Sequence, residues 1–188
     1  MSLRNSRRHY GSVSILLHWV MALLIIGLFV LGLYMTGLDY YHPWYVAAPN
    51  LHRSFGLLVL LLLVIRLLWR MFNPLPEPLG NDPRILQQLA EWVHRLFYLL
   101  LFVIAISGYL ISTADGRGIE VFGWFTVPAL IPSFDNMEDV AGDVHYLLAL
   151  AMMALVGLHS LAALKHHFLD RDSTLTRMLG FYRRNDNL

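Results

Sequence analysis

Residues 13–38 read VSILLHWVMALLIIGLFVLGLYMTGL and carry no formal charge. A helix needs roughly 20 apolar residues to cross the hydrocarbon core of a bilayer, and this run is long enough to do so. The run is longer than the apolar part of a signal peptide, and no cleavage site of small residues follows it, so we interpret it as a retained membrane helix. One histidine, His18, lies within it.

Three further apolar runs follow, at about residues 51–69, 96–114 and 144–164. Arg53 and Arg66 lie near the ends of the first of these, where long side chains can extend to the lipid headgroups. Gly142 and Asp143 precede the last run and suggest its start. With 57% hydrophobic and 14% charged residues, the chain is predicted to be all-α: an integral membrane four-helix bundle that forms a single domain over residues 1–188.

The basic residues are distributed unequally between the two ends of the predicted helices. Twelve of the fourteen Lys and Arg residues fall in the N-terminus, around the proline-rich connection 74–83 and in the C-terminal tail, which leaves Arg53 and Arg117 on the other side. Because basic residues are retained on the cytoplasmic side of a membrane, both termini and this connection are predicted to be cytoplasmic. The loops 39–50 and 115–143 then face outward.

The composition excludes several kinds of site. The chain has no cysteine, which excludes disulfides, thiolate metal sites, iron–sulfur clusters and covalently attached c-type haem. A formal net charge of +1 gives no support for nucleic-acid binding, which requires a basic face. Nine histidines stand against a single lysine, Lys165. Because ionisable groups in membrane spans usually have a function, the histidines are the first candidates for a site.

Four histidines lie within the predicted spans, at two depths. His145 and His159 are 14 residues apart in the last span, which separates them by about 21 Å along a helix but by only about 40° around it. His18 and His159 lie at similar distances from the cytoplasmic ends of their spans, whereas His52 and His145 both lie near outer ends. The sequence therefore predicts one histidine pair near each membrane surface.

Two facing imidazoles in a bundle core are enough to hold a noncovalent haem. The two pairs therefore predict two b-type haems, with their irons on the order of 20 Å apart along the membrane normal. One alternative is that the histidines only form hydrogen bonds in the core, and another is zinc or copper binding, for which two ligands per level fall short of the usual three or four. Small residues near these positions would let a macrocycle or another helix approach closely: Gly27, Gly32, Gly56 and Gly157.

Six stretches of the chain are specific when they are taken together. They are SILLHW at 14–19, LHRSFG at 51–56, VIRLLWR at 64–70, HRLFY at 94–98, AALKHHF at 162–168 and DSTLTRM at 172–178. This set resembles the bacterial dihaem cytochrome b561 proteins of the inner membrane, and the likeness covers nearly the whole chain. The resemblance implies a multi-pass inner-membrane protein with two noncovalent haem b groups, held by His18 with His159 on the cytoplasmic side and by His52 with His145 on the outer side.

The resemblance also implies a quinone site. Some members of the family oxidise superoxide at the outer face and reduce ubiquinone near the cytoplasmic face. The first histidine of their His-His pair resembles a quinone contact, which implies His166 here, with His94 and Lys165 as further candidates. Imidazole near neutral pH can supply both hydrogen bonds and protons to a quinone. Arg53, which follows His52, is a candidate partner for a haem propionate, with lipid headgroups as its alternative partner.

The charge of the outer loops opposes a superoxide donor. Residues 39–53 and 115–143 contain seven acidic residues against Arg53 and Arg117, a net charge of −5. Superoxide is an anion, which such a field does not attract. A cationic periplasmic redox protein is therefore an equal candidate for the electron donor.

Three hypotheses for function follow from these patterns. The first is an oxidoreductase that passes electrons from a periplasmic donor, with superoxide among the candidates, to ubiquinone in the membrane. The alternative is a haem-bearing membrane anchor subunit that only relays electrons for a separate redox partner. A transporter whose histidines relay protons is the third, and such a protein would be colourless.

Overall fold

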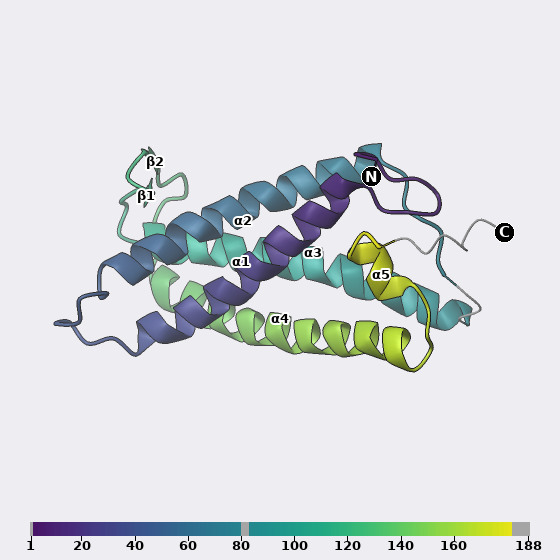
Figure 1. The fold of residues 1–188 in the computed structure, drawn as a ribbon. Helices are drawn as coiled ribbons and strands as arrows, with labels where there is room; N and C mark the ends of the chain where they lie inside the picture. The colour runs from purple at the N-terminus through teal and green to yellow at the C-terminus, as the bar shows by residue number, and fades with distance from the viewer. Residues whose placement is uncertain (1, 80–82, 182–188) are drawn as a thin grey trace.

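The computed structural model describes residues 2–79 and 83–181, and it contains four long helices that lie along one another (Figure 1). They are α1 (Ser12–Thr36), α2 (Ala47–Phe72), α3 (Arg84–Thr113) and α4 (Met137–Phe168). Each is long and apolar enough to cross a membrane. The predicted four-helix membrane fold is therefore confirmed. Arg183 and Arg184, which contribute to the basic C-terminal tail, lie outside the described residues.

Two of the helices begin earlier than the apolar runs suggest. Helix α3 starts at Arg84 instead of near residue 96, because the polar first part of this segment also forms helix. Helix α4 starts at Met137, after Asn136 in the left-handed conformation, so the start suggested by Gly142 and Asp143 is wrong. Hydropathy detects the part of a helix that lies in lipid and misses turns that extend beyond it.

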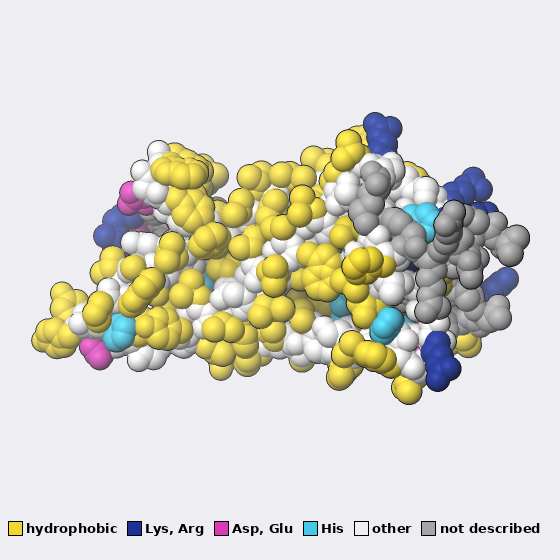
Figure 2. All heavy atoms as spheres, in the orientation of Figure 1, with side chains coloured by type: hydrophobic (Ala, Val, Ile, Leu, Met, Phe, Trp, Pro, Cys, Tyr) yellow, Lys and Arg dark blue, Asp and Glu magenta, His cyan; other side chains and the backbone are white. Residues whose placement is uncertain are grey.

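The bundle has a narrow core and an apolar outside. Helix α4 packs along α3, α1 packs along α2, and α2 also contacts α3, whereas the contact between α1 and α4 is slight. The core consists of side chains from all four helices: Met21, Val59, Leu63, Leu101 and Met152. Only 6% to 17% of the most apolar window of each helix is buried, and Figure 2 shows hydrophobic side chains along the bundle. This outward apolar surface requires lipid as the solvent.

One end of the bundle holds the N-terminal segment, the connection between α2 and α3, and the short helix α5 (Thr174–Met178) (Figure 1). We call it the terminal end. Asn5 donates a hydrogen bond to the Pro74 carbonyl (3.0 Å), and the Trp19 indole donates to the carbonyl of Met178 (2.8 Å). Arg177 of α5 donates to two further backbone carbonyls, those of Glu77 and Arg8. Segments from three parts of the chain are thus joined at this end.

The opposite end carries a feature that the sequence patterns did not predict, an antiparallel hairpin of β1 (Ile119–Val121) and β2 (Phe125–Val127). We call it the hairpin end. The hairpin is attached to α2 through the buried Ser54, whose hydroxyl accepts a hydrogen bond from the Phe122 amide (3.1 Å) and donates to the Glu120 carbonyl (3.4 Å). Ser54 is two residues from His52, so the hairpin lies over the start of the helix that carries a candidate ligand.

Candidate functional site: two histidine pairs

The first histidine pair lies toward the terminal end. The rings of His18 on α1 and His159 on α4 have centroids 6.4 Å apart and planes at 69°. The two helices that carry them touch only slightly. The pair therefore lies between two helices that are not closely packed against each other.

The second pair lies toward the hairpin end. The rings of His52 on α2 and His145 on α4 have centroids 6.1 Å apart and planes at 68°. Helix α4 thus contributes one ring to each pair, and its two histidines are separated by about 21 Å along the helix axis. The near-equal geometry of the two pairs indicates the same kind of site at both levels.

These separations can be compared with the room that one shared metal ion would need. A metal–imidazole bond is about 2.0 Å long, so two rings that both bound one ion would have centroids up to about 6.3 Å apart, and both pairs lie at about this separation. An edge-to-face contact between aromatic rings also spans this range, so the distance alone does not identify a metal site. The surroundings of His145 agree with metal binding, whereas His18 could bind a metal only after a movement of Arg66.

His145 is held with one nitrogen occupied and the other available. Its Nδ1 atom lies 2.9 Å from the carbonyl oxygen of Ile104 and 3.2 Å from the hydroxyl of Ser107. A carbonyl can only accept, so the proton of a neutral ring is on Nδ1 and the lone pair is on Nε2. This is the arrangement in which a carbonyl orients a metal-binding histidine. Ser107 is buried and was not among the sequence candidates.

Glycines adjoin both rings of the hairpin-end pair in a way that an added methyl group would disturb. A Cβ atom at Gly108 would lie 3.0 Å from Cε1 of His145, and one at Gly32 would lie 3.2 Å from Cε1 of His52. The helix backbone and the ring can approach this closely only because the side chain is absent. Of the four glycines noted in the sequence, only Gly32 has this role, because Gly27, Gly56 and Gly157 face open space.

His18 has an unexpected neighbour in Arg66, which does not extend to the headgroups as predicted. The guanidinium Nη2 lies 3.3 Å from Nδ1 of His18, and Nε donates to the hydroxyl of Tyr98 (3.2 Å). Because arginine only donates, Nδ1 of His18 is an acceptor here. Metal binding through Nε2 of a neutral His18 would place a proton on Nδ1, so Arg66 would have to move away from it. An arginine inside an apolar span was itself a signal of function.

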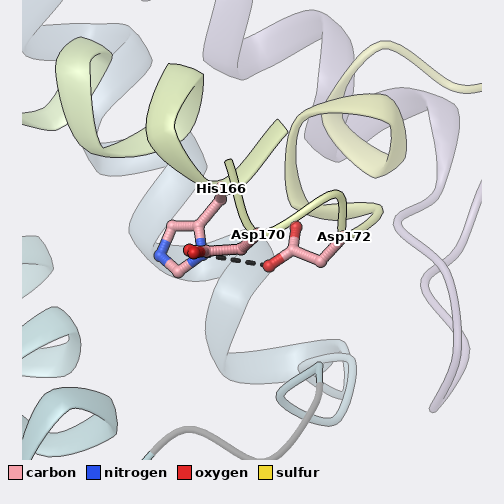
Figure 3. A group of neighbouring side chains, drawn as sticks. All are labelled: His166, Asp170 and Asp172. Atoms are coloured by element: carbon pink, nitrogen blue, oxygen red, sulfur yellow. Dashed lines mark hydrogen bonds and ion pairs between the residues drawn. The ribbon is translucent and has the colours of Figure 1, made fainter. Parts of the chain in front are cut away.

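The predicted group of His94, His166 and Lys165 divides into two parts. His94 lies against the terminal-end pair, with its centroid 5.6 Å from that of His159, and its Nδ1 faces the Ala90 carbonyl at 2.7 Å. His166 instead pairs with Asp170 and Asp172, each 3.0 Å from its Nδ1, as Figure 3 shows. Lys165 pairs with Asp170 at 2.7 Å.

Arg53 is directed back along its own helix. Its Nε donates to the carbonyl of Pro49 at 3.3 Å, and the side chain is half-buried. The guanidinium therefore stays at the hairpin end, close to His52. Its partner, a haem propionate or a lipid headgroup, stays a prediction.

The chain resembles known proteins over nearly its whole length. Residues 9–181 match the family model described as prokaryotic cytochrome b561. The chain is 49% identical to cytochrome b561 homolog 2 of Escherichia coli, over 96% of each chain. It is 32% identical to the probable superoxide oxidase CybB of Yersinia pestis, over 92% of this chain and 96% of the relative. It is also 22% identical to cytochrome b561 homolog 1 of E. coli, over 90% of this chain and 96% of the relative.

These matches confirm the resemblance that the six sequence stretches suggested. They also agree with a bundle of four membrane-crossing helices. A cytochrome b protein transfers electrons through b-type haem, for which paired histidines in a bundle core are suitable ligands. The chain is a multi-pass membrane protein of the prokaryotic cytochrome b561 family.

Proposed function

We propose that the chain is a dihaem quinone oxidoreductase that carries electrons from a donor at the hairpin end to ubiquinone at the terminal end. His18 with His159 and His52 with His145 would hold two noncovalent b haems, which supply one-electron redox chemistry when bound. The observation that carries the proposal is the presence of two histidine pairs at two levels of α4, with ring centroids 6.4 Å and 6.1 Å apart. The histidines would bind and orient the haems, and the apolar helices exclude water from around them.

The proposal places the terminal end in the cytoplasm of a bacterial cell and the chain, as one domain, in the inner membrane. Twelve of the fourteen basic residues fall at this end in the sequence, as the positive-inside rule requires. The hairpin end then faces the periplasm. Ubiquinone is reduced close to the cytoplasm, where protons for the reaction are available.

The direct test is a visible spectrum of the purified chain, reduced minus oxidised, with haem quantification. We expect two low-spin b haems per chain and reduction of a ubiquinone analogue after dithionite reduction without any added subunit. A membrane anchor subunit, the alternative function, would keep the haems but require a co-purifying partner for turnover. A colourless protein would contradict both functions and favour a proton-relaying transporter.

For the electron donor, the charge of the hairpin end and the name of a relative favour different molecules. The name of the Yersinia pestis relative suggests superoxide. The hairpin end is acidic, with exposed Glu138 and Asp139 in the first turn of α4. Arg117, one of two arginines on this side, is paired with Asp115, which holds the pKa of that carboxyl below its usual value through a hydrogen bond of 2.6 Å. An anionic donor must approach against this field.

The rate of haem reduction by superoxide is therefore expected to rise with ionic strength. Exposed charges are screened over a Debye length of about 10 Å at 0.1 M salt, which weakens the repulsion. Neutralising Glu138 and Asp139 together should raise the rate of haem reduction by superoxide by a few-fold and lower the rate of reduction by a cationic donor protein. Both rates are measured by stopped-flow absorbance. Neutralising Glu91, an exposed carboxylate on α3, should change neither rate. A superoxide rate that falls as salt is added would contradict this account of the surface.

Replacing Gly108 by Ala should weaken haem binding at the hairpin end. The new methyl group would lie 3.0 Å from Cε1 of His145, so the ring must move by a few tenths of an ångström from the position that Ile104 and Ser107 hold. Changes to groups that orient a metal ligand typically cost about 10-fold to 100-fold in affinity. We expect the variant to lose one haem on dialysis in detergent while the terminal-end haem stays, measured by haem content per chain.

Gly157→Ala is the matched control, since Gly157 is exposed on the same helix as His145 and an added Cβ meets nothing within 4 Å. It should retain both haems. Equal haem content in the two variants would show that the contact at Gly108 does not position the ligand.

A further inference from the structure

The chain turns back on itself directly after α4 and brings two carboxylates to one imidazole nitrogen. Asp170 Oδ2 and Asp172 Oδ2 each lie 3.0 Å from Nδ1 of His166 (Figure 3). Arg171 between them has a φ of 55°, in the left-handed region. The other oxygen of Asp172 accepts a hydrogen bond from the Thr174 amide at 2.8 Å, so the start of α5 fixes this carboxylate.

These contacts determine which nitrogen of His166 is available. Carboxylates at neutral pH only accept hydrogen bonds, so Nδ1 carries a proton that it donates to them. The Nε2 atom lies on the side of the ring away from both carboxylates, as Figure 3 shows. His166 is half-buried and lies at the terminal end, in the last turn of α4. Any exchange of a proton with a bound molecule must therefore use Nε2.

We propose that Asp172, assisted by Asp170, positions His166 to deliver protons from Nε2 to the quinone. This inference rests on the proposed function, because it needs quinone reduction at the terminal end. Asp172 is a positioning residue: it touches His166 and not the quinone.

The proton balance follows from the overall reaction. A quinone becomes a quinol by taking two electrons, which the electron donor supplies one at a time, and two protons. Each proton delivered by His166 breaks an Nε2–H bond and forms an O–H bond on a quinone oxygen, and the ring keeps its proton on Nδ1. Nε2 then takes a new proton from water at the cytoplasmic surface, which resets the group for the next transfer.

The two carboxylates contribute unequally, because their other partners differ. A ring that donates from Nε2 while Nδ1 keeps its proton is positively charged, and a facing carboxylate stabilises that charge. Asp170 is shared with Lys165, whose Nζ is 2.7 Å away. Burial favours the neutral form of Asp172, but hydrogen bonds from Thr174 and His166 outweigh it and hold the pKa of this carboxyl below its usual value. Asp172 is thus the more strongly committed partner.

Arg177, the charged residue of α5, directs its side chain away from His166. Arg177 on α5, the element packed against the end of α4, donates to the backbone carbonyls of Glu77 and Arg8. The carboxylates of Asp170 and Asp172 both form ion pairs with His166. The three side chains could also surround a divalent cation, but Lys165 already places a positive charge on Asp170.

The test is Asp172→Asn in the full, haem-loaded protein. Asparagine keeps an oxygen to accept from the Thr174 amide, so the turn is preserved while the negative charge is lost. After reduction with dithionite, reoxidation of the haems by a ubiquinone analogue is followed at several pH values. We expect a rate about tenfold lower across this pH range, because His166 loses the carboxylate that orients its ring, and a rate restored toward the wild-type value in Asp172→Glu, which keeps a carboxylate. The haem content and spectra should not change.

Glu91→Gln is the control for loss of one carboxylate, because Glu91 is exposed and forms its ion pair with Arg95 at 3.5 Å. It should give the wild-type profile. A wild-type profile for Asp172→Asn would overturn the relay, and so would a stoichiometric bound divalent metal that this variant loses. If the unmodified protein fails to reduce the quinone, the proposed function itself is wrong. If the unmodified protein reduces the quinone, and reoxidation is slow in His166→Gln but not in Asp172→Asn, the proposed function stands and the role of Asp172 is overturned.

Discussion

Replacing His159 by Ala is expected to halve the haem content of the purified protein and to leave the second haem low-spin. The reason is geometric: His159 faces His18 at a centroid distance of 6.4 Å, whereas the pair of His52 and His145 lies about 21 Å away along α4. A haem with one remaining imidazole binds far more weakly than one with two. Extraction with acid acetone followed by haem quantification gives the count, and the visible spectrum reports the spin state.

His94 provides a control for this test, because the centroid of its ring lies 5.6 Å from that of His159. His94→Ala removes a third imidazole from the same level but should retain both haems, since we assign His94 as a neighbour of the pair and not as a ligand. His145→Ala should lose only the hairpin-end haem. A full complement of low-spin haem in His18→Ala would show that the pairing of ligands is wrong.

The depth of the histidines could be predicted from the sequence because the rise of a helix is fixed. Residue counts from the ends of apolar runs placed His18 level with His159 and His52 level with His145, and in the structure these rings face each other. The depth of a residue does not depend on which helices pack together. It is a single dimension, the distance along the membrane normal, in which each residue advances by about 1.5 Å.

Rotation of each helix about its axis could not be predicted in the same way. Arg66 was expected to point to the headgroups, yet it turns inward to His18. Ser107 and Gly108 lie against His145 only because α3 packs along α4 with that face inward. The rotation is set by the packing of side chains from several helices, which is a long-range property of the whole bundle.

The hairpin and α5 could not be predicted from the sequence for a different reason. Ile119–Val121 and Phe125–Val127 are three residues each, and such short strands have no clear alternating pattern. The hairpin depends on Ser54 of α2 for its attachment, and α5 depends on contacts with Trp19 and Glu77. Elements that are stabilised by distant partners leave little trace in local sequence.

Replacing His166 by Leu should slow reoxidation of the haems by ubiquinone about 100-fold while both haems remain reducible by dithionite. Loss of a positioned general acid typically costs about 10²-fold to 10⁴-fold in rate. Leucine fills a similar volume but can neither donate a hydrogen bond to a quinone oxygen nor carry a proton. His166 lies seven residues beyond His159, so the haem ligands should be undisturbed, and the spectra should match those of the wild type.

His167→Leu is the matched control, because it removes the adjacent imidazole of the same His-His pair. The ring of His167 packs against Phe168 at a centroid distance of 4.8 Å, whereas the imidazole that pairs with Asp170 and Asp172 is that of His166. The control should therefore reoxidise at nearly the wild-type rate. Because dithionite reduces the haems without using the quinone site, a slow step in His166→Leu must lie between the haem and the quinone. If His166→Leu keeps both haems and an unchanged reoxidation rate, His166 is not part of the quinone site. The next candidate is then His94, which lies beside the terminal-end pair.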